Sequence, residues 1–90
     1  MIRITYSHKS FRDGIQTDSS KNTAPPFSDI KSARSWAVNK WKFLNWPENK
    51  TTEKMIGEKD GKKVTLTEWT AEKNDGVYLK QFEMTILEVG

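Results

Sequence analysis

The segment between Ser28 and Pro47 constrains the fold most, because it carries the spacing of an amphipathic helix. Its apolar residues recur at intervals of three and four: Ile30, Ala33, Ala37, Trp41 and Leu44. That spacing places them on one side of a helix with 3.6 residues per turn. A single helix cannot bury such a side alone, so the rest of the chain must supply the surface that covers it.

Residue types mark both ends of this helix. The prolines at 25–26 keep the preceding chain extended, and Ser28 is the expected N-cap. Asp29 follows it, where a carboxylate interacts well with the positive end of the helix dipole. Pro47 disfavours the helical conformation of the residue before it, so we expect the helix to end near Asn45.

The remaining segments show the alternation of strands. Residues 2–6 alternate apolar and polar side chains, which predicts a strand with one buried face. Asp60-Gly61 and Asn74-Asp75-Gly76 are turn signals that separate alternating runs at 53–59, 62–69 and 77–89. We therefore predict an α+β fold, a single β-α-β-β-β domain. One helix packs on one face of a four-stranded, mostly antiparallel sheet.

Residues 8–27 are mostly polar. Such a composition buries little apolar surface to offset the entropy of ordering the chain. Within a single small domain over 1–90 we therefore expect a long polar surface loop at about 8–27, and long loops often serve as contact elements. A short hairpin over Asp13-Gly14, flanked by Phe11 and Ile15, is the alternative.

Composition limits the chemistry that is available. The 90 residues include no cysteine and one histidine, His8, which excludes a metal site with two or more nitrogen or sulfur ligands within one copy. The common glycine-rich phosphate loops are absent. We therefore expect no cofactor and no enzymatic activity. Without a signal-peptide core or a membrane-spanning run, we expect a cytoplasmic protein that does not contact membranes.

The charge is unevenly distributed. The formal net charge is +3, but residues 1–50 hold nine Lys or Arg against four Asp or Glu, a balance of +5. Residues 51–90 hold six against eight, a balance of −2. A basic surface on the N-terminal half suits an acidic protein or a nucleic acid.

The helix carries the clearest part of this charge. Lys31, Arg34 and Lys42 share a side of it that is separate from the apolar side. Lys9, Arg12 and Lys21 in the predicted loop extend the strip, and the candidate aromatic anchors are Trp36, Phe43 and Trp46, whereas Trp41 belongs to the core. Together these residues predict a binding protein that docks on a protein or a nucleoprotein complex.

Three hypotheses about function follow from this surface. The first is a small phage-type inhibitor of a host nucleoprotein complex. Proteins that block RNA-guided defence complexes are similar in their small size and in their lack of catalytic motifs. The second is a stand-alone protein that binds DNA or RNA through phosphate contacts without sequence specificity.

The third hypothesis is based on a resemblance. Residues 2–7, followed by Lys9 and Arg12, resemble the start of small ribosome-dependent endoribonuclease toxins over about a dozen residues. The resemblance implies metal-independent RNA cleavage, with His8, Arg12 and Lys80 in acid/base and phosphate-stabilising roles. That family follows its first strand with a helical hairpin, whereas residues 17–26 here are of turn-forming types.

Overall fold

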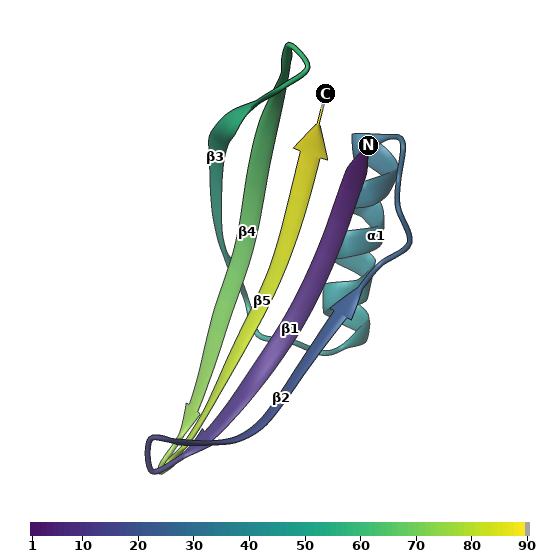
Figure 1. The fold of residues 1–90 in the computed structure, drawn as a ribbon. Helices are drawn as coiled ribbons and strands as arrows, with labels where there is room; N and C mark the ends of the chain where they lie inside the picture. Colours follow the sequence, from purple (N-terminus) through teal and green to yellow (C-terminus); the bar gives the residue numbers. More distant parts are fainter. Residues whose placement is uncertain (90) are drawn as a thin grey trace.

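The computed structural model describes residues 1–89 and contains six elements. They are β1 (Ile2–Arg12), β2 (Ile15–Thr23), α1 (Ile30–Phe43), β3 (Lys50–Lys59), β4 (Lys62–Asp75) and β5 (Tyr78–Val89). The strands form one antiparallel sheet in the order β2-β1-β5-β4-β3, and α1 lies on one of its faces (Figure 1). The predicted α+β class is confirmed, with five strands in place of the predicted four.

The additional strand is where the sequence predicted a loop. The expectation of a long surface loop at 8–27 is wrong, because β1 continues to Arg12 and β2 returns beside it from Ile15. Asp13 (φ 50°) and Gly14 (φ 79°) make the turn in the left-handed region that two-residue hairpins require. β2 is almost wholly exposed, so backbone pairing with β1 orders this segment in place of apolar burial.

The core is a single layer between α1 and the sheet. Ile4 on β1 and Met84 on β5 are fully buried there, and the apolar side of the helix supplies Ala33, Ala37 and Trp41. The small side chains of the two alanines let the helix approach the strands closely. Aromatic side chains surround this layer and are half-buried, namely Tyr6, Phe27, Trp36, Trp46 and Trp69.

The two ends of α1 differ in how they are held. The N-cap is Asp29, not the predicted Ser28, and its carboxylate accepts hydrogen bonds from the Ser32 backbone N–H (3.0 Å) and hydroxyl (2.9 Å). The helix ends at Phe43, and Asn45 (φ 56°) turns the chain back in the left-handed conformation that asparagine tolerates. The Trp41 Nε1–H then donates to the Pro47 carbonyl (2.8 Å), which fixes the segment after the helix.

The Asp29 cap makes stability depend on pH. Hydrogen bonds from Ser32 hold the pKa of this carboxylate below its ordinary value of 3.8. Because folding lowers this pKa, the cap stabilises the fold fully at pH values above 3.8. Its contribution is lost as the pH falls through the folded-state pKa. We expect Asp29→Ala to lower the melting temperature at pH 7, and the difference from wild type to shrink in acid, measured by circular dichroism. Asp29→Asn, an equally good cap, is the control, and equal melting of Asp29→Ala and wild type at pH 7 would contradict the assignment.

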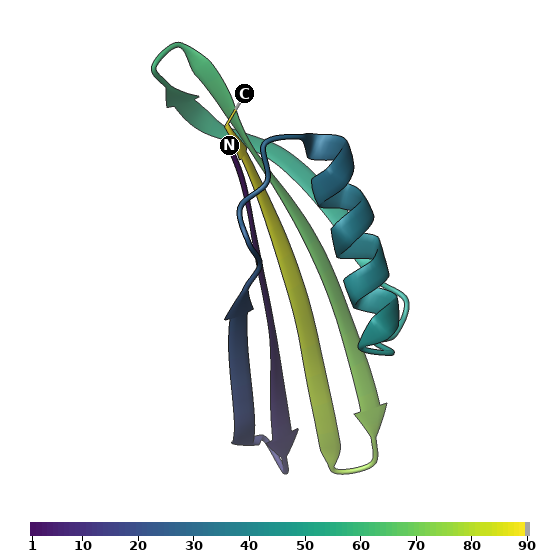
Figure 2. The same ribbon diagram turned by 90° about the vertical axis from the view of Figure 1, so that its right-hand side faces the viewer.

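The helix covers only part of the sheet. The molecule is elongated, with extents of 47 × 25 × 19 Å, and the turn ends of β1–β2 and β4–β5 continue well past the end of α1 (Figure 2). At the opposite end the β3–β4 hairpin projects beyond the chain termini. The helix-bearing face is therefore open below the C-terminal end of α1. No helix within residues 1–89 has both the length and the apolar character needed to cross a bilayer.

Candidate functional site

The outward side of α1 is basic and free of acidic residues. Lys31, Arg34 and Lys42 are all exposed there, and Val38 lies among them with 40% of its surface accessible. The helix contains no Asp or Glu, and within residues 1–89 none of these three cations pairs with a carboxylate. We call Lys31, Arg34 and Lys42 the basic helix face. Its charges are uncompensated and available to a partner.

The three candidate aromatic anchors lie in different surroundings. Phe43 is 80% exposed, and the Lys40 ammonium lies 5.2 Å from its ring centroid and 5.6 Å from that of Tyr6. Trp36 is half-buried, with its ring centroid 5.8 Å from that of Tyr6. Trp46 is also half-buried, and Trp41 packs edge-on against it at 4.8 Å. Phe43 is thus the most accessible of the three, while the two tryptophans also close the edge of the core.

The three cations predicted to extend the strip do not adjoin it. Lys9 and Lys21 lie on the helix-free face of the sheet, because side chains alternate along a strand and Tyr6 and His8 face the helix side. Arg12 is on the helix-bearing face but near the β1–β2 turn, where its guanidinium lies 5.6 Å above the Tyr78 ring. The structure therefore divides the predicted set between two faces.

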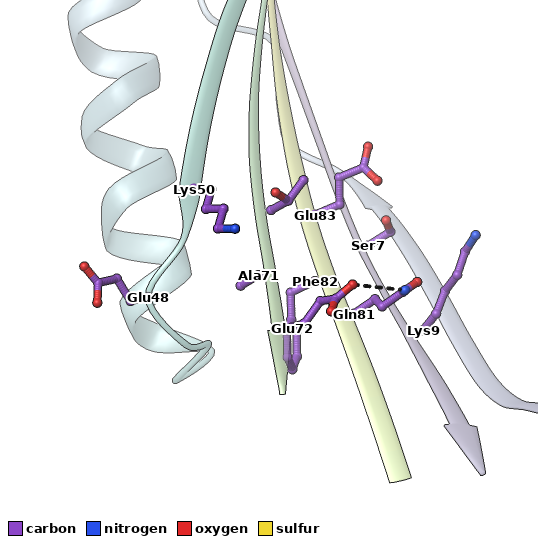
Figure 3. Close-up of a pocket in the computed structure, with 10 residues that line it drawn as sticks. Ser7, Lys9, Glu48, Lys50, Ala71, Glu72, Gln81, Phe82 and Glu83 are labelled. Atoms are coloured by element: carbon purple, nitrogen blue, oxygen red, sulfur yellow. Dashed lines mark hydrogen bonds between the residues drawn. The ribbon is translucent and has the colours of Figure 1, made fainter. Parts of the chain in front are cut away.

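A hollow on the helix-free face carries mixed charge. It has a volume of about 640 Å³, and Figure 3 shows lysines and glutamates interspersed around it. Lys9 and Lys50 are its cations, and its carboxylates are Glu48, Glu72 and Glu83. Glu72 also accepts a hydrogen bond from the Gln81 amide (3.4 Å). Three carboxylates against two ammonium groups do not favour a polyanion on this face.

A second hollow lies below the C-terminal end of α1, on the helix-bearing face. Its volume is about 660 Å³, and the segment 44–47 after the helix forms its upper wall. Phe82 and Trp46 supply aromatic surface, with their ring centroids 5.1 Å apart. Lys73 and Lys80 from the neighbouring strands β4 and β5 line it as well. We call this cavity the helix-end hollow.

Lys73 and Lys80 face each other directly across the β4–β5 ladder. Like charges in this position destabilise a sheet, and both side chains are exposed. Within residues 1–89 neither lysine pairs with a carboxylate. The pair therefore brings two positive charges to the hollow, against the one carboxylate, Asp18, that also lines it.

The histidine is held by its neighbours on β2. The Ser20 hydroxyl lies 2.7 Å from His8 Nδ1, and an Asp18 carboxylate oxygen lies 3.6 Å from Nε2. His8 and Asp18 both line the helix-end hollow. Both ring nitrogens of the histidine thus face groups of the protein itself. Among residues 1–89 no group of three or more side chains could hold a metal ion.

Sequence reasoning missed part of this site. Lys73, Lys40 and Tyr78 were not among the predicted binding residues. The turn between β4 and β5 consists of Gly76 and Val77. Lys73 therefore lies opposite Lys80, a register that the predicted turn at Asn74-Asp75-Gly76 does not give. His8, Arg12 and Lys80, which the toxin resemblance grouped together, do share the helix-bearing face of β1 and β5. In this chain β1 is followed by β2 in a β-hairpin, not by the helical hairpin that the resemblance implies.

The fold and the site define a class of protein: a small α+β domain in which one basic helix covers part of one face of a five-stranded antiparallel sheet. No protein-family model, no curated protein and no solved structure matches this chain.

Proposed function

We propose that this protein acts by binding and not by catalysis, and that its basic helix face docks on an acidic or nucleic-acid-containing partner. The observation that carries this proposal is the basic helix face itself: three exposed cations on a helix without a single carboxylate. A helix whose only task is to cover the sheet gains stability from acidic residues spaced to pair with its lysines, and α1 has none. Its charge is therefore suited to a partner.

The surroundings of the helix support a docking role. Val38 lies among the cations, and Phe43 lies at the edge of the apolar side with most of its ring exposed. Aromatic and basic residues together are enriched at the energetic centres of interfaces. Lys40, above the Phe43 ring, adds a fourth positive charge near the end of the helix. This combination supplies both electrostatic attraction and apolar contact.

Within a nucleoprotein complex, the favoured target is the nucleic acid. A groove that holds DNA or RNA is itself positively charged, so a basic helix is repelled from an empty groove and attracted to the phosphates or to an acidic protein surface. An inhibitor of such a complex would therefore act by covering its nucleic acid or an acidic subunit.

The surroundings of the histidine favour binding over RNA cleavage. A general base needs a free nitrogen within hydrogen-bonding reach of the proton that it removes. The two ring nitrogens of His8 face Ser20 and Asp18, and the Arg12 guanidinium lies over the Tyr78 ring, 5.6 Å from its centroid. We therefore expect an RNA oligonucleotide to remain intact after incubation with the protein.

The proposal is tested by reversing the charge of the basic helix face, with Lys31→Glu, Arg34→Glu and Lys42→Glu in one variant. Labelled single-stranded DNA, a DNA duplex and polyglutamate serve as probes in fluorescence anisotropy. We expect the variant to lose about tenfold or more in affinity for a probe that wild type binds. For wild type on the duplex, three phosphate contacts predict about 40-fold weaker binding when salt rises from about 50 to about 200 mM.

The control variant carries the same charge change elsewhere: Lys54→Glu, Lys59→Glu and Lys63→Glu on the projecting β3–β4 hairpin, where all three residues are exposed. Circular dichroism establishes that both variants are folded, as expected for exposed substitutions that each change stability by about 0.5 kcal/mol or less. Should the helix variant bind every probe as tightly as wild type does, the basic helix face is not the docking surface.

A further inference from the structure

We propose that the helix-end hollow binds single-stranded nucleic acid, with an unpaired base stacked on the exposed Tyr78 ring beside it and phosphates held by Lys73 and Lys80. This inference rests on the proposed function and names the ligand class and a second contact site for it. The hollow lies directly below the end of α1, whose last turn carries Lys40 and Lys42.

Aromatic and basic residues alternate along β5 on this face. Phe82, Lys80 and Tyr78 follow one another at every second position, which places successive side chains about 7 Å apart on the same face of the strand. Phe82 is the buried floor, Lys80 lines the hollow, and Tyr78 is 49% exposed just beyond it. Proteins that bind single strands combine aromatic platforms with a positive path for the backbone, and this arrangement has both parts.

The neighbouring strands complete the arrangement. Lys73 on β4 lies directly opposite Lys80, which places two ammonium groups side by side between the aromatic positions. Arg12 on β1 lies over the Tyr78 ring at 5.6 Å. A tyrosine ring and a guanidinium plane both stack on unpaired bases. The two side chains therefore form one platform at the open end of the hollow.

The arrangement favours a single strand over a duplex and over an acidic peptide. Bases in a duplex are stacked on each other, so platforms within a concave surface reach only unpaired bases. An acidic peptide would satisfy the lysines but leave the exposed aromatic surface of Tyr78 without a planar partner. Two carboxylates lie nearby: Asp18 lines the hollow and faces His8, and Asp75 lies opposite Tyr78 at the β4–β5 turn. A single strand, which has unpaired planar bases and anionic phosphates, fits the lysines and the aromatic ring together.

The decisive variant is Lys80→Glu. It turns the Lys73–Lys80 pair into a pair of opposite charges, so the fold is stabilised while the hollow loses positive charge. We expect affinity for an oligothymidylate of about 12 nucleotides to fall about tenfold, its salt slope to decrease by about 0.7 to 1.4, and the melting temperature to rise slightly. A lower affinity combined with a higher melting temperature separates a lost contact from a damaged fold.

The matched control is Lys62→Glu. Lys59 and Lys62 also face each other across a ladder, at the tip of the β3–β4 hairpin far from the hollow. This control makes the same change to a like-charge pair, and we expect it to leave oligothymidylate affinity unchanged. Tyr78→Ala is expected to weaken binding about tenfold through lost stacking, whereas Tyr78→Phe retains the ring and is expected to bind like wild type.

The outcomes separate this inference from the proposed function. If Lys80→Glu and Tyr78→Ala bind oligothymidylate like wild type while reversal of the basic helix face abolishes binding, the hollow is not the site and the proposed function stands. Binding of polyglutamate alone likewise overturns the hollow as a nucleic-acid site and leaves the helix as a docking surface. If wild type binds none of the probes, both proposals fail. Weakening by Lys80→Glu and Tyr78→Ala, but not by Lys62→Glu, supports the hollow.

Discussion

Trp41→Ala is expected to destabilise the protein by about 3–5 kcal/mol, as large-to-small substitutions of buried aromatic residues do. Only 7% of the Trp41 surface is exposed, and its ring contacts Trp46 (4.8 Å) and Trp69 (6.1 Å) edge-on. A domain of this size has a total stability of about 5–15 kcal/mol. The loss is therefore a large fraction of the total stability, and it should appear as a lower midpoint of urea denaturation followed by circular dichroism.

Trp41→Phe separates the packing of this ring from its hydrogen bond. Phenylalanine keeps an aromatic side chain in the core but removes the Nε1–H that donates to the Pro47 carbonyl. The variant should lose less stability than Trp41→Ala and should loosen the segment after the helix, seen as faster hydrogen exchange at residues 44–47. A loss below about 1 kcal/mol for Trp41→Ala would show that α1 does not pack on the sheet as described.

The helix was the best predicted part of the fold, because one element contained all of its signals. The three-four spacing placed Ala33, Ala37 and Trp41 on the buried side, and the proline at 47 marked the end correctly. The N-cap was displaced by one residue, from Ser28 to Asp29. Both residue types cap well, so local preference alone could not decide between them; the observed bond from the Ser32 N–H to Asp29 does.

β2 was not predicted, because hydrophobic periodicity identifies only strands that bury apolar side chains. After Ile15 its sequence is polar, so it lacks the alternation of apolar and polar residues that predicts a strand. The strand exists because β1 continues past its apolar half and offers backbone groups for pairing, and because Asp13-Gly14 supplies a two-residue turn. Edge strands of this kind depend on the neighbouring strand more than on their own side chains. The hairpin alternative was visible at Asp13-Gly14, but the composition of the segment argued for a loop.

The candidate site was predictable only in part for a similar reason. The cations of the basic helix face lie on one element, so helical periodicity alone brings them together. The helix-end hollow combines β4, β5 and the segment after α1, and its composition depends on register and on where the helix stops. Lys73 pairs with Lys80 because the turn residues are Gly76 and Val77, further along the chain than the turn signal at 74–76 predicted. That region is open because α1 is shorter than the strands that it covers. The pattern of residues within any one element does not predict this difference in length.

Ile4→Ala is expected to cost about 2–5 kcal/mol, because it removes a fully buried side chain from the centre of the single core layer. Ile4 lies opposite Ile86 on β5, and the Ala24 N–H donates to its carbonyl oxygen (2.9 Å). A domain with one helix on one sheet face has no second layer that could move in and fill the cavity. The loss should therefore fall in the upper part of that range, measured by urea denaturation.

Lys9→Ala on the same strand provides the matched comparison. Lys9 is exposed on the helix-free face, so its replacement should change stability by no more than about 0.5 kcal/mol. The contrast between the two substitutions tests which face of the sheet is the core, because a shift of one residue in register would exchange the faces of every side chain on β1. Equal losses for Ile4→Ala and Lys9→Ala would contradict a core confined to the helix-bearing face, and with it the placement of His8, Ser10 and Arg12 beside the helix-end hollow.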